Sequence, residues 1–117
     1  MSDLAQARRL ALSLPEATEE PHFDMTSFRV RGKIFVTAPP GGARLHVFVD
    51  PLEVEGYVAQ DPGAFEPLYW GKRLRGVRVT LADASPASLA ELIEEAWRCK
   101  APKSLVAAFD QRPGAEG

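Results

Sequence analysis

The segment 27–50, SFRVRGKIFVTAPPGGARLHVFVD, constrains the fold more than any other part of the chain. Apolar side chains alternate there with basic, aromatic or polar ones in three short runs, at Phe28–Arg31, Lys33–Val36 and Arg44–Val49. Successive side chains of a strand point to opposite faces of a sheet. The pattern therefore predicts three consecutive strands that share one apolar face and one basic, partly aromatic face.

The same alternation assigns each residue of the second run to a face. It places Ile34 and Val36 on the apolar face, and Lys33 and Phe35 on the basic face. Phe35 would then join His46 and the cations on a surface that is open to a partner.

Turn residues and a second alternating stretch complete the predicted sheet. Tight turns are expected at residues 31–32 and 39–42, where glycine accepts the positive φ that such turns require. A further pair of strands is predicted at 68–70 and 76–81, around a loop at 71–75.

Three helices are predicted from capping residues and from prolines at helix starts and stops. They span about residues 3–14, 50–60 and 85–101. Residues 16–21 are interpreted as a polar connection, and 105–109 as one further helical turn. The predicted order is α-β-β-β-α-β-β-α, an α+β two-layer sandwich in which the helices cover one face of an antiparallel sheet.

The length of 117 residues suits one domain, expected at 1–110, followed by a flexible tail at 111–117 that offers nothing to bury. Cys99 is the one cysteine, which excludes an internal disulfide and favours the reducing cytoplasm. No apolar run approaches the roughly 18 residues of a membrane span, and the N-terminus lacks the pattern of a signal peptide. We therefore expect a cytoplasmic protein that does not engage a membrane, with a monomer as the default.

Basic residues gather in two windows that contain no acidic residue, 25–49 and 67–82, although the formal net charge is −2. These windows hold eight of the 14 Lys and Arg residues. They are Arg29, Arg31, Lys33, Arg44, Lys72, Arg73, Arg75 and Arg78. A protein of mildly acidic total charge can still present a basic surface, because the local field matters more than the sum.

Several stretches resemble the MmcQ/YjbR-like family: RRLALSLPEATEEPHF, SFRVRGKIFV, YWGKRLRGVRVTL and EEAWRCKAPKSL. The resemblance covers nearly the whole chain up to about Phe109. It implies a two-layer fold akin to that of frataxin (CyaY-like), a double-wing arrangement and DNA binding. By position, the wings would be the hairpin around Arg31–Lys33 and the loop Gly71–Gly76. The resemblance supplies no catalytic residue.

Two interpretations of the eight cations remain open. They can hold phosphates of a nucleic acid, with interleaved rings stacking on bases, or they can be solvated charges paired with carboxylates of the helices. A non-catalytic domain that binds a protein or a small anionic ligand through the same face is the alternative function. We expect no enzyme, cofactor or metal site, because the chain lacks a nucleophile motif, a phosphate-binding glycine motif and the His and Cys ligands that zinc requires.

Overall fold

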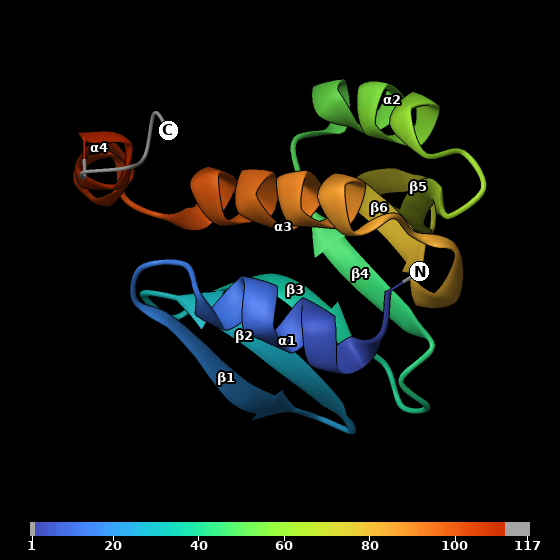
Figure 1. Cartoon of the computed structure of the whole chain (residues 1–117), viewed down its shortest axis with the longest axis horizontal. Helices are drawn as coiled ribbons and strands as arrows, with labels where there is room; N and C mark the ends of the chain where they lie inside the picture. The colour runs from blue at the N-terminus through green and yellow to red at the C-terminus, as the bar shows by residue number, and fades with distance from the viewer. Residues whose placement is uncertain (1, 112–117) are drawn as a thin grey trace.

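The structure, a computed structural model, describes residues 2–111, and within them a six-stranded sheet and four α-helices (Figure 1). The elements in chain order are α1 (Leu4–Leu12), β1 (Ala17–His22), β2 (Met25–Val30), β3 (Lys33–Ala38), β4 (Arg44–Phe48), α2 (Pro51–Gln60), β5 (Phe65–Trp70), β6 (Arg73–Thr80), the 3₁₀ turn η1 (Leu81–Asp83), α3 (Pro86–Lys100) and α4 (Lys103–Gln111). Gln111, expected as the first residue of the flexible tail, is instead the last residue of α4. The rest of the expected tail, 112–117, lies outside the described part of the chain.

The sheet is antiparallel throughout, in the order β1-β2-β3-β4-β6-β5. Its two halves, β1–β3 and β4–β6, meet at a short seam where β3 pairs with β4. In the described chain this pairing consists of Val36 with Val47 and Thr37 with His46. The strands separate beyond these pairs, so the sheet is continuous but opens next to the end of β4.

Helices α1, α2 and α3 lie against one face of the sheet, as predicted (Figure 1). α1 and α3 run across the sheet, and α2 lies over β5 and β6. The core between the layers includes Phe28, Val47 and Val79 from the sheet and Trp97 from α3, all with no exposed surface. No helix of residues 2–111 is long and apolar enough to cross a membrane.

Helix ends follow the predicted capping signals. The side chains of Asp3, Asp50 and Ser85 accept hydrogen bonds from backbone N–H groups in the first turns of α1, α2 and α3. Pro51 and Pro86 occupy the first helical positions, where a missing N–H leaves no donor unsatisfied.

The polar connection predicted at 16–21 is wrong, because Ala17–His22 forms β1. This edge strand pairs along its whole length with β2, from Ala17 opposite Val30 to His22 opposite Met25. Most of its side chains are exposed, so the backbone supplies the pairing and no apolar alternation marks the strand. Pro21 is tolerated because an edge strand can lack a ladder donor.

The face predicted for Phe35 is also wrong, since its ring has no exposed surface and belongs to the core. Phe28 pairs with Val36 and Arg29 pairs with Ile34, which leaves Phe35 as the extra residue of a β-bulge. A bulge shifts the alternation by one residue. Phe35 and Val36 therefore both point into the core, and Ile34 lies on the opposite face.

The further turn predicted at 105–109 is a complete helix, α4, of nine residues. Phe109 is buried and packs on Trp97 with ring centroids 5.1 Å apart. α4 lies beyond the end of α3 (Figure 1). The contact between Phe109 and Trp97 attaches it there.

Candidate functional site

The structure divides the eight predicted cations among three places. Arg29, Arg44 and Arg78 lie on strands, facing away from the helices. Arg31 and Lys33 lie at the β2–β3 turn, and Lys72, Arg73 and Arg75 at the β5–β6 hairpin. The single basic face predicted from alternation is therefore wrong in part: Lys33 pairs with Val30, on the helix side of the sheet.

Two of the cations are neutralised by neighbouring carboxylates. Arg31 forms an ion pair with Glu16, and Arg78 with Glu66 at 3.2 Å. The hydrogen bond from Arg31 lowers the pKa of Glu16 from its ordinary value. These pairs are exposed and contribute little to stability, but a phosphate has to compete with the carboxylate for each arginine.

Arg29 is held by neutral acceptors. Its Nε donates to Ser27 Oγ at 2.9 Å and its Nη2 donates to the carbonyl of Pro21 at 3.3 Å. The side chain therefore lies flat along β1 and β2, and its charge remains uncompensated by any carboxylate of the described residues.

The β5–β6 hairpin carries the densest group of cations. Its turn is Gly71–Lys72, so Arg73 and Arg75 belong to β6 rather than to the longer loop predicted from the sequence. The Arg75 guanidinium lies 4.7 Å from the centroid of the Trp70 ring, a cation–π contact that fixes its position. Tyr69 and Trp70 are 54% and 53% exposed, so both rings are accessible to a partner.

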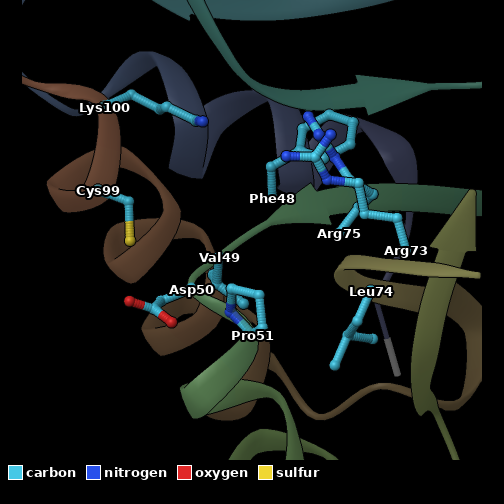
Figure 2. Close-up of a pocket in the computed structure, with 9 residues that line it drawn as sticks. All are labelled: Phe48, Val49, Asp50, Pro51, Arg73, Leu74, Arg75, Cys99 and Lys100. Carbon is cyan, nitrogen blue, oxygen red and sulfur yellow. The ribbon is translucent and has the colours of Figure 1, made fainter.

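Two adjoining cavities lie where β4 ends and the seam opens. The rim cavity, of about 400 Å³, is lined by Phe48, Val49, Asp50, Pro51, Arg73, Leu74, Arg75, Cys99 and Lys100 (Figure 2). The sheet cavity, of about 420 Å³, is lined by His22, Met25, Ile34, Thr37, His46, Phe48, Trp70, Arg75 and Lys100. Phe48, Arg75 and Lys100 line both.

Lys100 is the site residue that sequence reasoning missed. It is the last residue of α3, and Figure 2 shows its side chain directed from the helix end toward the space beside Phe48 and the arginines. A lysine in the last turn of a helix is the ordinary complement of the helix dipole. Its sequence position therefore gave no signal, and only the packing of α3 beside β4 brings it to Arg75.

His46 lies on β4 at the seam, half-buried between Thr37 of β3 and Arg78 of β6. Burial, with a smaller contribution from the charge of Arg78, lowers the pKa of His46 from its ordinary value. The imidazole is therefore neutral near pH 7, when it can both donate and accept a hydrogen bond.

A family model described as YjbR matches residues 12–99. The chain belongs to the YjbR family. The match confirms the resemblance noted in the sequence, and it spans all six strands and α3 up to Cys99 of this YjbR chain.

The YjbR chain is also similar in structure to the Deinococcus radiodurans protein DR2400, whose domain is described as DUF419. The TM-score is 0.68 at 21% sequence identity, over 95% of this chain and 81% of that one. This likeness shows a shared fold, and the α+β architecture predicted from the sequence is confirmed. No curated protein matches the chain.

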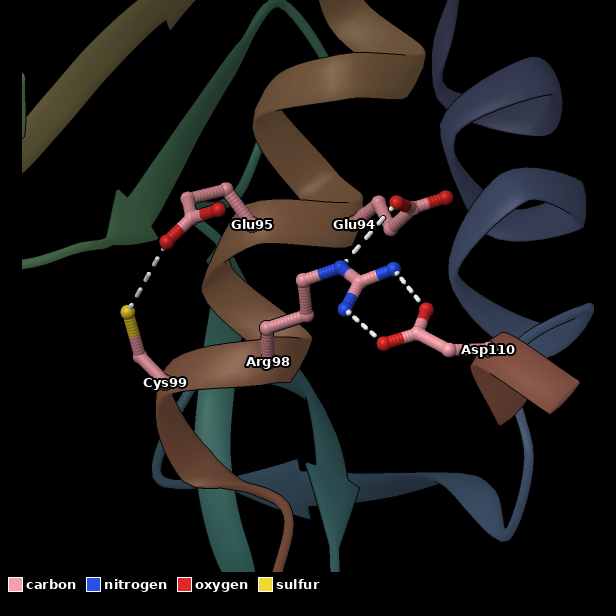
Figure 3. Close-up of polar contacts among 5 residues, drawn as sticks. All are labelled: Glu94, Glu95, Arg98, Cys99 and Asp110. Atoms are coloured by element: carbon pink, nitrogen blue, oxygen red, sulfur yellow. Dashed lines mark hydrogen bonds and ion pairs between the residues drawn. The ribbon is translucent and has the colours of Figure 1, made fainter. Parts of the chain in front are cut away.

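Polar side chains of α3 in the YjbR chain contact one another and a residue of α4. Burial raises the pKa of Cys99, which disfavours the thiolate, and its Sγ lies 3.7 Å from Glu95 Oε2 (Figure 3). The neighbouring residue Arg98 forms ion pairs with Glu94 of α3 and Asp110 of α4 (Figure 3). Within residues 2–111, no group of three or more His, Cys, Asp or Glu side chains is placed to hold a metal ion.

Proposed function

We propose that the protein is a non-enzymatic DNA-binding protein that holds phosphates by charge, with the β5–β6 hairpin as its main contact. The observation that carries the proposal is the run Lys72, Arg73 and Arg75 beside two exposed aromatic rings, Tyr69 and Trp70. Among the described residues, none of these three cations takes part in an ion pair.

Phosphate binding releases the counterions condensed on DNA, and this release drives affinity without reading the base sequence. Free cations contribute most, because an arginine that already holds a carboxylate gives up that partner on binding. We therefore assign the larger part to Lys72, Arg73 and Arg75 and a smaller part to Arg31 and Arg78.

The β2–β3 turn is the second contact in this proposal. Lys33 is exposed there, and it has no carboxylate partner among residues 2–111. The two hairpins act as the wings that the family resemblance suggested. The proposal also includes a monomer as the default state. It includes a cytoplasmic location, because the single cysteine suits a reducing compartment.

A salt titration tests the proposal. Binding of a labelled duplex is measured by fluorescence anisotropy between roughly 50 and 200 mM salt. We expect affinity to fall steeply as salt rises, and we expect Lys72→Ala and Arg73→Ala each to reduce the slope of log K against log salt by about one.

Arg9→Ala is the matched control, because Arg9 is an exposed cation on α1, in the helical layer. It should leave the slope unchanged, and Arg31→Ala should change it less than Arg73→Ala does. The proposal fails if duplex DNA does not bind near 50 mM salt, or if Arg9→Ala weakens binding as much as Arg73→Ala.

A second candidate function, binding of a small anionic ligand, rests on a different observation. The rim cavity and the sheet cavity are recesses of about 400 and 420 Å³, a size typical of small-molecule sites.

A further inference from the structure

The sheet cavity differs in character from the charged hairpin beside it. Met25, Ile34, Phe48 and Trp70 give it an apolar and aromatic lining, and no Asp or Glu is among its lining residues within the described chain. A cavity of about 420 Å³ is within the usual range of small-molecule sites. It is suited to a flat apolar ring rather than to a bare ion.

Polar groups of the sheet cavity are placed around this apolar lining. His46 presents a neutral imidazole and Thr37 a nearly buried hydroxyl from the paired strands of the seam. Each can donate and accept a hydrogen bond. The edge of a heteroaromatic ring carries the donors and acceptors that such groups match, whereas a hydrocarbon ring does not.

Positive charge is concentrated where the two cavities meet. Arg75 and Lys100 line both cavities, and Arg73 lines the rim cavity close by (Figure 2). Asp50 also lines the rim cavity, but its carboxylate accepts the N–H of Leu52 at 2.9 Å as the cap of α2. An anion is therefore favoured at the junction, on the side of Arg75 and Lys100, away from Asp50.

The rings of Phe48 and Trp70 hold each other in position before any ligand binds. Phe48 and Trp70 meet edge to face with centroids 5.5 Å apart, and Arg75 holds Trp70 from one side. Pre-organised rings lose little conformational entropy when a ligand binds.

We propose that the sheet cavity binds one nucleotide unit, with the base against Phe48 and Trp70 and its phosphate at Arg75 and Lys100. The unit is either a free nucleoside monophosphate or one unstacked base of a single strand. In the second case the inference rests on the proposed function and deepens it, because it adds a preference for single-stranded over duplex DNA.

The first experiment uses adenosine 5′-monophosphate, with adenosine and inorganic phosphate as separate probes. Binding is followed by calorimetry and by the indole N–H resonance of Trp70. We expect the monophosphate to bind at least about tenfold more tightly than either half alone, because both the ring and the phosphate have their own contacts. Equal binding of inorganic phosphate and the monophosphate would show a simple anion site and overturn the inference.

Two variants separate the cavity from the hairpin. Ile34→Trp fills the sheet cavity without changing charge, and Lys72→Ala removes hairpin charge without touching the cavity lining. Ile34→Trp should abolish monophosphate binding, and Lys72→Ala should leave it unchanged. Trp70→Ala should weaken monophosphate binding about tenfold to a hundredfold. Because Trp70 is half exposed, this variant should still fold, and it tests the site if Ile34→Trp does not fold.

The second experiment compares a short single strand with a duplex of the same sequence. If the single strand binds more tightly and Ile34→Trp removes only that excess, both proposals stand. Salt-driven duplex binding without any monophosphate binding or single-strand excess would overturn the nucleotide site and leave the proposed function intact. Monophosphate binding without binding of either DNA would support the nucleotide site and overturn the proposed function.

Discussion

Gly76 determines how closely β6 approaches β4. It pairs with Phe48 on one side and Leu68 on the other, and a Cβ at this position would lie 2.0 Å from the carbonyl oxygen of Val47. That oxygen belongs to the backbone and has no alternative rotamer. We expect Gly76→Ala to destabilise the protein by at least about 2 kcal/mol in urea unfolding, because strand β6 must shift.

Gly56→Ala is the matched control for this prediction. Gly56 is exposed in the interior of α2, and a Cβ there meets nothing within 4 Å. It should raise the free energy of unfolding by roughly 0.5–1 kcal/mol, since alanine loses less backbone entropy than glycine in a helix. A stability loss in Gly56→Ala as large as that in Gly76→Ala would contradict the steric explanation.

His46 makes the folded state sensitive to mild acid. Its pKa is lowered in the folded protein, mainly by burial and also by Arg78, so the unfolded chain binds a proton more readily. The stability that the neutral imidazole contributes is complete above about pH 6.5 and is lost as the pH falls through the lower folded pKa.

The prediction is tested by urea unfolding at pH 8 and at successively lower pH. The wild type should lose more stability than His46→Gln over this fall, because glutamine does not titrate. Parallel pH profiles for the two proteins would show that His46 does not carry the effect.

At the scale of elements, α4 depends on one end of α3. Arg98 binds Asp110 at 2.6 Å and lies 5.4 Å from the ring of Phe109, which packs on Trp97. Exposed ion pairs contribute little, so the buried ring supplies most of the attachment together with Leu105 and Val106, which also pack against the core. We expect Phe109→Ala to expose the amides of α4 to hydrogen exchange and to leave those of β2 and β3 protected.

Ser104→Ala provides the comparison, because Ser104 is exposed on the same helix. It should change the exchange of α4 amides little. If Phe109→Ala exposes the sheet and α4 to the same degree, α4 is an integral part of the core rather than a separately attached helix.

The elements differ in how far the sequence revealed them. Helices α2 and α3 begin with an acceptor side chain and a proline, a local signal that needs no tertiary context. β1 has no such signal. Backbone pairing with β2 makes it a strand, and most of its side chains are exposed to solvent. The bulge at Phe35 was equally hidden, because it depends on the register of β2 against β3.

At the scale of the whole molecule, the two tryptophans report on different environments. Trp97 has no exposed surface and donates from its indole to the carbonyl of Pro15 at 3.0 Å, whereas Trp70 is 53% exposed. We expect acrylamide to quench wild-type fluorescence in two distinct phases. Trp70→Phe should retain only the phase that is poorly quenched, and efficient quenching in that variant would contradict the buried position of Trp97.

The candidate site was partly visible in the sequence. Lys72, Arg73 and Arg75 adjoin one another in the chain, and their acid-free window identified them. The cavities were not visible, since they arise from segments that are distant in sequence, the end of β4, the start of β6 and Lys100 of α3. Spatial convergence of this kind depends on the packing of whole layers.

The brevity of the pairing between β3 and β4 has a consequence for measurement. Val36 and Thr37 face Val47 and His46 across the seam, and the sheet cavity is lined by Thr37 and His46 themselves. A ligand bound in that cavity would contact both halves of the sheet and hold them together at the seam, where the strands share the fewest pairs. Binding of a ligand should therefore slow deuterium uptake at the amides of Val36, Thr37, His46 and Val47. The measurement needs no label on the ligand and does not depend on the ligand's chemical identity.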